Sequence, residues 1–240
     1  MIKLVTFDLD DTLWSVMPVV IKANQLAWRW MQEHTPAFTD RFEMRDLLEG
    51  STLRKELLAR FPEIKHSMTL IRLRVLELGY QQVGYSHEEA QHWANRAFEY
   101  FHEHRHAVEP YSEVEPMLAK LKQAGYQIGA LSNGNAEVSR TPLADWFDFQ
   151  FNADSVGTAK PHPLMFEKAL AHAGVSHLET VHIGDHPIND VRAARDLGIK
   201  TIWVNPEGLD YPQPVDADLC IECISEIPEA VAILANRAGS

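Results

Sequence analysis

The chain has 240 residues, of which 45% are hydrophobic and 23% charged, a composition typical of globular proteins and not of disordered, collagen-like or coiled-coil chains. Its formal net charge of −12 disfavours nucleic-acid binding, because an acidic surface repels a phosphate backbone. No apolar run reaches the roughly 18 residues needed to span a bilayer, and the N-terminal apolar run meets acid too early for a signal peptide. We therefore expect a cytoplasmic protein that binds neither membranes nor nucleic acid.

Cysteine and histidine give weak signals. Cys220 and Cys223 are the only cysteines, so no disulfide framework is expected and a reducing compartment fits the chain. Their C-x-x-C spacing is compatible with a redox or half-zinc site, but without a second Cys/His pair nearby, two small residues on a late strand are the simpler interpretation. His102 and His106 are one helical turn apart and could share a ligand, although twelve histidines more simply reflect composition.

The first hundred residues contain one strand followed by helices. The apolar run Ile2–Phe7 ends abruptly in acid, as a strand buried on both faces does. From Leu13 to Val108 apolar residues recur at helical spacing and nothing alternates with a period of two. The predicted helices are Pro18–Glu33, Phe42–Phe61, Ser67–Leu78 and Ser86–Glu103, the last opening with a capping box from Ser86 to Glu89. Helices of this length can bury a small core of their own.

After Pro110 strands and helices alternate, which predicts a parallel sheet covered by helices on both faces. The predicted strands are Gln127–Leu131, Phe149–Asn152, Thr180–Ile183, Lys200–Val204 and Leu219–Ile221. The predicted helices are Ser112–Ala124, Ala136–Leu143, Pro163–Ala173, Asp190–Leu197 and Ile227–Arg237. We therefore predict an α/β protein with a doubly wound, Rossmann-like parallel sheet core, residues 1–13 plus 109–240, and an inserted all-α cap domain, residues 14–108.

Polar residues follow the strands at the sheet edge where open parallel sheets bind their ligands. The set comprises Asp8, Asp10, Asp11 and Thr12 after the first strand, Ser132, Asn133 and Gly134 after the second, Lys160 in a later loop, and Asp185, His186 and Asp190 after the fourth. Grouped carboxylates raise one another's pKa, and a divalent cation relieves that cost. Oxygen ligands alone favour Mg²⁺ over zinc, and Mg²⁺ seeks phosphate oxygens, so the set predicts a phosphoryl site.

Other members of the set suit the same chemistry. Ser132 and Asn133 at a helix start can hydrogen-bond phosphate oxygens, and Lys160 supplies a compact positive charge. Asp8 and Asp10 point the same way if strand geometry persists through Leu9, which would place a nucleophile beside a proton carrier. Taken singly, these residues are also ordinary turn and helix-start residues, and it is their ordered occurrence that favours chemistry.

The ordered motifs resemble a known family. Asp8-x-Asp10-x-Thr12, Ser132-Asn133, Lys160-Pro161, and Gly184-Asp185 with Asp190 resemble the haloacid dehalogenase-like superfamily of phosphohydrolases. The helical insert is similar to that superfamily's cap, so the resemblance covers essentially the whole chain. Four motifs in order, each after the right element, make a strong signal. The resemblance implies Mg²⁺-dependent hydrolysis of a small-molecule phosphomonoester.

The resemblance also implies roles for individual residues. Asp8 would attack phosphorus and become an aspartyl-phosphate, while Asp10 would protonate the leaving oxygen and then take a proton from the attacking water. The other implied roles are metal ligation by the carboxylates of Asp8 and Asp185 and the backbone carbonyl of Asp10, phosphate binding by Ser132, Asn133 and Lys160, and support by Thr12 and by Asp190, which would orient Lys160 or a metal-bound water.

The second aspartate separates the branches of the superfamily. Its dehalogenases are similar in the first motif but lack the second Asp, since a halide leaves without a proton, so Asp10 favours a phosphatase. A phosphomutase would keep both aspartates and stays an alternative, as does a non-catalytic module that binds a phosphorylated metabolite.

The finer resemblance concerns the substrate. The strings Leu131–Ala136 and Val204–Gly208 look most like bacterial phosphatases of flavin mononucleotide and of the phosphorylated ribityl-aminouracil intermediate of riboflavin synthesis. Expected substrates are therefore flavin mononucleotide, that intermediate, a sugar phosphate or a nucleotide. Trp14, near the aspartates, is a candidate for an aromatic wall against a planar ring.

Overall fold

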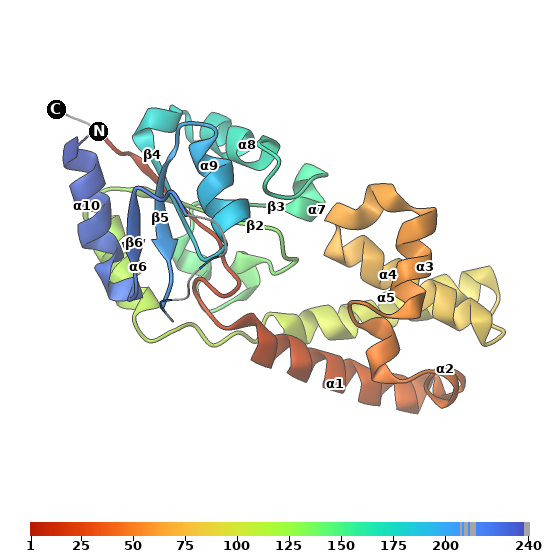
Figure 1. Cartoon of the computed structure of the whole chain (residues 1–240). Helices are drawn as coiled ribbons and strands as arrows, with labels where there is room; N and C mark the ends of the chain where they lie inside the picture. Colours follow the sequence, from red (N-terminus) through yellow and green to blue (C-terminus); the bar gives the residue numbers. More distant parts are fainter. Residues whose placement is uncertain (207, 209–210, 212–214, 238–240) are drawn as a thin grey trace. The chain divides into compact units, whose positions relative to one another are not determined.

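The computed structural model describes residues 1–206, 208, 211 and 215–237, and the chain divides into two compact units. The core unit comprises Met1–Ser15 and Val108–Ser240, and the helical unit comprises Val16–Ala107 (Figure 1). Within the string Val204–Gly208, Glu207 lies outside the described residues. In the part of the chain that is described, no helix has the length and apolar character needed to cross a membrane.

The core unit is built on one parallel sheet. Among the described residues its strands are β1 Leu4–Phe7, β2 Gln127–Ser132, β3 Phe149–Asn152, β4 Thr180–Gly184, β5 Lys200–Val204 and β6 Leu219–Ile221. Their spatial order is β3-β2-β1-β4-β5-β6, with every neighbouring pair parallel. This is the doubly wound order, in which the direction of winding reverses between β1 and β4. The predicted fold class is confirmed.

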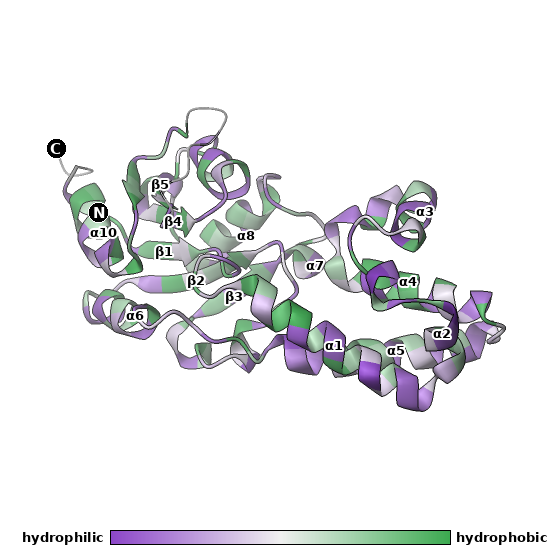
Figure 2. Cartoon of the chain, turned by 60° about the horizontal axis from the view of Figure 1, so that its bottom comes forward, coloured by the Kyte–Doolittle hydropathy of each residue, from purple (hydrophilic) through white to green (hydrophobic). Residues whose placement is uncertain are grey.

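Helices cover both faces of this sheet. They are α6 Val114–Gln123, α7 Ala153–Val156, α8 Leu164–Ala173, α9 Ala193–Arg195 and α10 Ile227–Arg237. Helices α6 and α10 contact each other on one face, whereas α8 and α9 share a hydrophobic cluster on the other (Figure 1). All four residues of β1 are buried, which explains why this strand is apolar on both faces. Figure 2 shows hydrophobic residues concentrated along these inner strands.

The helical unit has a hydrophobic core of its own. Its helices are α1 Val16–His34, α2 Pro36–Arg41, α3 Thr52–Arg60, α4 Met68–Gln82 and α5 His87–Arg105. Phe38 is completely buried, and its ring contacts those of Trp28, Phe42 and Tyr80. The predicted capping box at the start of α5 is present, since Ser86 Oγ accepts from the Glu89 N–H and Glu89 accepts from the Ser86 N–H. Helices α1 and α5 show mixed hydrophilic and hydrophobic faces (Figure 2).

The predicted helix Phe42–Phe61 is wrong, because the structure breaks it in the middle. A single short turn, Met44–Leu47, is followed by a loop in which Gly50 has a φ of 81°. Ser51 then starts α3 as its N-cap, with its hydroxyl accepting the Arg54 N–H. A left-handed glycine followed by a capping serine ends one helix and begins another, and this pair overrides the continuous apolar spacing.

The predicted helix Ala136–Leu143 is also wrong. One short 3-10 turn, Val138–Arg140, lies within this region, and a second, Ala144–Trp146, follows it. Thr141 precedes a proline, which disfavours helical backbone, and its φ and ψ are −106° and 167°. The predicted helix Asp190–Leu197 is shortened to α9, and a π-helical segment, Pro187–Arg192, precedes it.

We expect Phe38→Ala to destabilise the helical unit by about 3–5 kcal/mol, because it removes a fully buried ring and leaves a cavity among three aromatic neighbours. The measurement is urea unfolding followed by near-ultraviolet circular dichroism. Phe61→Ala is the control, since the Phe61 side chain is 42% exposed and should change stability far less. Equal effects of the two substitutions would contradict this account of the core.

Candidate active site

The predicted site residues stand at the carboxyl ends of three adjacent strands. Asp8 follows β1, Ser132 ends β2, and Asp185 follows β4, so all three flank the point where the winding of the sheet reverses. The Asp8 N–H still donates to the Ile183 carbonyl at 2.9 Å, which extends the pairing of β1 with β4 by one residue. Ligands bind at this edge in doubly wound sheets, because the helices leave a crevice there.

Lys160 connects the ends of these strands. Its side chain is almost completely buried, and its ammonium donates to Asp8 Oδ1 at 2.7 Å, Asp190 Oδ1 at 2.5 Å and the Leu131 carbonyl at 2.6 Å. An ammonium group has three N–H donors, so these contacts use all of them. The lysine is thus fixed in position between the first, second and fourth strands.

Asn133 positions the Lys160 loop. The Asn133 side chain donates to the Lys160 carbonyl at 2.9 Å and accepts the Lys160 N–H at 2.7 Å. The predicted phosphate-binding role of Asn133 stays a prediction, because the structure places its amide on the backbone of Lys160. Ser132 Oγ accepts the Gly134 N–H at 3.0 Å and lies at the end of β2, beside the same loop.

The electrostatics of the cluster follow from its burial. Burial raises the pKa of Asp8 well above its usual value; Lys160 opposes this effect, and the charges of Asp190 and Asp185 add to it. Burial also disfavours the charge on Lys160, but Asp190 and Asp8 outweigh it and raise the pKa of the lysine. For Asp185, burial and the charge of Asp190 raise the pKa to about 6. The site therefore carries more negative charge than one lysine can neutralise.

His182 is a member of the site that the sequence analysis missed. It lies buried on β4, where its Nε2 hydrogen donates to Asp190 Oδ1 at 3.3 Å and its Nδ1 accepts from the Thr6 hydroxyl at 2.9 Å. Burial lowers the pKa of His182, which favours the uncharged ring. Although burial disfavours the Asp190 charge, Lys160 and His182 hold the pKa of Asp190 well below its usual range. A histidine within the apolar strand Thr180–Gly184 is the signal that could have revealed it.

His186 and Gly184 also contribute to the position of the Asp190 carboxylate. The His186 N–H donates to Asp190 Oδ2 at 3.0 Å, while the His186 ring accepts the N–H groups of Ile188 and Asn189 at 3.1 Å each and so caps the π-helical segment. A Cβ atom on Gly184 would clash with the Asp190 carboxyl group, so only glycine permits this close approach.

Asp185 is fixed from two sides. The Thr12 hydroxyl donates to Asp185 Oδ1 at 2.9 Å, and the Trp203 indole N–H donates to the Asp185 carbonyl at 2.8 Å. The Asp185 N–H in turn contacts Thr12 Oγ1 at 3.2 Å. Thr12 thereby links the loop after β1 to the loop after β4, and its supporting role stays a prediction.

Asp10 lies beyond the end of β1, in an isolated β-bridge with Trp14. A turn begins at Leu9, whose carbonyl accepts the N–H groups of Thr12 and Leu13, and β1 itself ends at Phe7. The predicted common direction of Asp8 and Asp10 stays a prediction. Trp14 donates its indole N–H to Asp10 Oδ1 at 2.8 Å. A Cβ on Gly134 would lie 2.5 Å from Asp10 Oδ2, so the carboxylate lies against the loop after β2.

Trp14 does not form the expected aromatic wall. Its side chain is completely buried, and its indole N–H is used by Asp10. The prediction that Trp14 lines a cleft is wrong, since the ring packs inside and fixes the carboxylate in place.

The carboxylates fit a divalent cation. Asp8, Asp185 and Asp190 each offer an oxygen within 4.8 Å of the others. Both oxygens of Asp190 accept hydrogen bonds, whereas one oxygen of Asp8 and one of Asp185 accept none from any residue that the structure describes. An oxygen-only donor set of this kind suits Mg²⁺, so Asp8 and Asp185 are the residues available to hold it.

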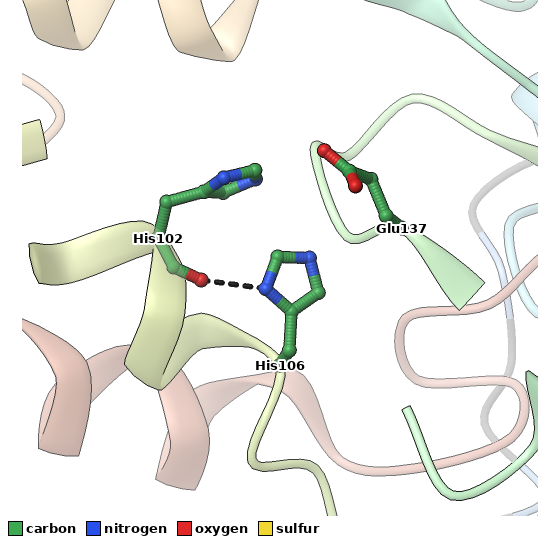
Figure 3. A group of neighbouring side chains, drawn as sticks. All are labelled: His102, His106 and Glu137. Carbon is green, nitrogen blue, oxygen red and sulfur yellow. Dashed lines mark hydrogen bonds between the residues drawn. The ribbon is translucent and has the colours of Figure 1, made fainter. Parts of the chain in front are cut away.

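The pair Cys220 and Cys223 and the pair His102 and His106 are not part of the aspartate–lysine cluster. Both cysteines are exposed free thiols, Cys220 on β6 and Cys223 just after it, where Cys223 Sγ contacts Ser225 Oγ. In the helical unit His106 Nδ1 donates to the His102 carbonyl at 2.6 Å, as Figure 3 shows. That bond belongs to the end of α5.

Comparison with known proteins identifies the family. The family model described as haloacid dehalogenase-like hydrolase matches residues 2–198. The chain is 32% identical to the 5-amino-6-(5-phospho-D-ribitylamino)uracil phosphatase YigB of Escherichia coli K12, over 91% of this chain and 90% of the relative. It is 30% identical to a glyceraldehyde 3-phosphate phosphatase of Pyrococcus furiosus, over 100% of this chain and 95% of the relative.

One solved structure is similar to this chain over almost its whole length. The crystal structure of a 2-haloacid dehalogenase from Pseudomonas syringae pv. Tomato DC3000 superimposes with a TM-score of 0.90 and 39% identity, covering 97% of this chain and 99% of that one. The motif order, the doubly wound sheet and these similarities agree with one another. The chain belongs to the haloacid dehalogenase-like hydrolases, an enzyme family whose matching relatives here include phosphatases.

Proposed function

We propose that this enzyme is a Mg²⁺-dependent phosphatase of a small phosphomonoester, with Asp8 as its nucleophile. The observation that carries the proposal is the Lys160 ammonium, buried against Asp8 at 2.7 Å, at a sheet edge that also presents Asp185 and Asp10. The two curated relatives named as phosphatases support it, since the chain covers nine tenths or more of each.

In the proposed reaction, Asp8 attacks phosphorus and the bond from phosphorus to the leaving oxygen breaks. Asp10 gives its proton to that oxygen, so an alcohol departs and an aspartyl-phosphate remains on Asp8. Asp10, now ionised, takes a proton from water, which attacks phosphorus and releases inorganic phosphate. The proton balance closes, because Asp10 regains the proton it gave.

The remaining residues prepare this chemistry. Lys160 favours the ionised form of Asp8 and can neutralise charge on the phosphoryl oxygens, while Ser132 can donate its hydroxyl to them. Bound Mg²⁺, held by Asp8 and Asp185, would supply further positive charge to the transferring group. Asp190 keeps Lys160 in place, and Thr12 does the same for Asp185.

The helical unit is proposed to act as the cap domain, which selects the substrate and excludes water. For the substrate itself we propose a phosphorylated riboflavin precursor or flavin mononucleotide, with sugar phosphates and nucleotides as the other members of the class. The similarity to the YigB phosphatase supports the first of these.

Dehalogenation is a second candidate, favoured by the 39% identity to a structure described as a 2-haloacid dehalogenase. Asp10 argues against it, because loss of a halide requires no proton donor. A phosphomutase is distinguished by an isomerised product, and a phosphometabolite-binding module by the absence of turnover.

A panel assay tests the function. We expect phosphate release from a set of phosphomonoesters that includes flavin mononucleotide, sugar phosphates and nucleoside monophosphates, with Mg²⁺ present and not with chelator. An Asp185→Asn variant should need far more Mg²⁺, because it loses one charged ligand. Chloride release from 2-chloropropionate is assayed in parallel. Chloride release, together with no phosphate release from any ester, would show that the protein is a dehalogenase.

Asp8→Asn should abolish turnover while the protein stays folded, because the amide is a poor nucleophile and removes one negative charge from a crowded cluster. The measurements are phosphate release and far-ultraviolet circular dichroism. An Asp8→Asn protein with a near-normal phosphatase rate would disprove the mechanism.

Asp10→Asn should lower the rate by about 10²- to 10⁴-fold for alkyl phosphates, the usual contribution of a proton donor. The loss should be much smaller for p-nitrophenyl phosphate, because nitrophenolate leaves without a proton. The comparison is kcat for the two substrates on the same protein. Equal losses for both would assign Asp10 a structural role instead.

A further inference from the structure

A tight turn in the core unit brings Trp14 back beside Asp10. Asp11, which follows Asp10, has a left-handed φ of 61°, which is uncommon for a residue other than glycine. The Asp11 N–H donates to the Trp14 carbonyl at 2.8 Å, and Trp14 forms a β-bridge with Asp10. The Trp14 ring therefore meets a carboxylate that lies four residues earlier in the chain.

A second segment of the core unit also holds Trp14. Trp14 forms an antiparallel bridge with Pro110, and the Tyr111 N–H donates to the carbonyl of the preceding Leu13 at 3.0 Å. The Trp14 side chain is completely buried, so close packing leaves this large ring little freedom to move. An indole that is fixed in this way can hold a carboxylate in one orientation.

The two oxygens of Asp10 have different surroundings. Trp14 Nε1 donates to Asp10 Oδ1 at 2.8 Å. A Cβ atom on Gly134 would lie 2.5 Å from Asp10 Oδ2 and 3.3 Å from Ser132 Oγ, so these two oxygens lie near the same point of the loop after β2. Because Ser132 is proposed to bind phosphoryl oxygens, Oδ2 is the Asp10 oxygen on the side of the proposed phosphate site.

We propose that Trp14 is a positioning residue for the general acid and acts through Asp10; this inference rests on the proposed function. A carboxyl oxygen that carries a proton is a poor acceptor, so the indole N–H keeps the acidic proton off Oδ1 and assigns it to Oδ2. The indole thereby selects one orientation of the carboxyl group, and proton transfer requires such alignment of the donor with the leaving oxygen.

The step that Trp14 assists is the transfer of one proton. As the bond from phosphorus to the leaving oxygen breaks, the Oδ2–H bond of Asp10 also breaks, its electron pair stays on Asp10, and the proton forms an O–H bond on the departing alcohol. The indole N–H continues to donate to Oδ1. A hydrogen bond to a charged acceptor is stronger than one to a neutral acceptor, so this bond strengthens as the proton leaves and favours the transition state.

The test compares esters that differ in their need for a proton. Trp14→Phe should lower kcat by about 10- to 100-fold for the alkyl phosphate that the panel assay turns over fastest, the usual effect of one hydrogen bond to a charged group. For p-nitrophenyl phosphate the loss should be about twofold or less, because nitrophenolate leaves without a proton. Trp14→β-(3-benzothienyl)alanine replaces the N–H by sulfur and keeps the ring shape, so it should give the same result without a cavity.

Trp203→Phe is the matched control, because the Trp203 indole donates at the same 2.8 Å to the Asp185 carbonyl and not to Asp10. It should lower kcat for both esters by the same factor and leave their ratio unchanged. In an Asp10→Asn protein, Trp14→Phe should cost about twofold or less on the alkyl phosphate, because the proton donor is already lost and the two effects are not additive. Far-ultraviolet circular dichroism verifies that each variant is folded.

Each outcome decides the inference. Equal losses on both esters in Trp14→Phe and in the sulfur analogue, or an undiminished loss in the Asp10→Asn protein, would overturn it and leave Trp14 a packing role only. Absence of turnover on every ester by the unaltered protein would reject the proposed function and the inference with it. Turnover whose dependence on the leaving group is unaffected by residue 14 would reject the inference alone.

Discussion

The buried Lys160 ammonium is the constraint on which the candidate site depends. Its three donors go to Asp8, Asp190 and the Leu131 carbonyl, so the ends of three strands must meet within hydrogen-bond distance of a single nitrogen. A lysine without these acceptors would be too costly to bury. The doubly wound strand order satisfies the requirement, because it brings β1 between β2 and β4.

The sequence was sufficient to predict the strands and the set of site residues for one physical reason. Apolar runs mark buried parallel strands, and the carboxyl ends of such strands share one edge of the sheet, so Asp8, Ser132 and Asp185 could be grouped without knowing any distance. His182 and the role of Asn133 were not predictable in the same way. The Thr6–His182 and Asn133–Lys160 hydrogen bonds join segments far apart in the sequence. The histidine within an apolar strand was the only local sign of the first, and the role of Asn133 had no local sign.

The two wrongly predicted helices also show that local sequence patterns do not reveal every contact or backbone angle. In Ala136–Leu143, the Val138 N–H and the Ala136 carbonyl bind the side chain of Gln150, which comes from β3. A partner twelve or more residues away thus takes the backbone groups that a helix would have used. In the helical unit the break is local, but it depends on Gly50 adopting a left-handed φ, which spacing alone does not reveal.

Lys160 binds two aspartates whose hydrogen-bonding surroundings differ. Asp190 receives Lys160, His182 and the His186 N–H, and this surplus of donors keeps it ionised despite complete burial. Asp8 shares the same ammonium but accepts from no further donor in the described part of the chain; burial raises its pKa, and the charges of Asp190 and Asp185 add to the rise that Lys160 opposes. The carboxylate that is fully bonded serves as an anchor, and the one that is underbonded keeps an oxygen able to meet a cation or phosphorus. In the proposed mechanism, the different settings of Asp8 and Asp190 therefore follow from the unequal distribution of donors around them.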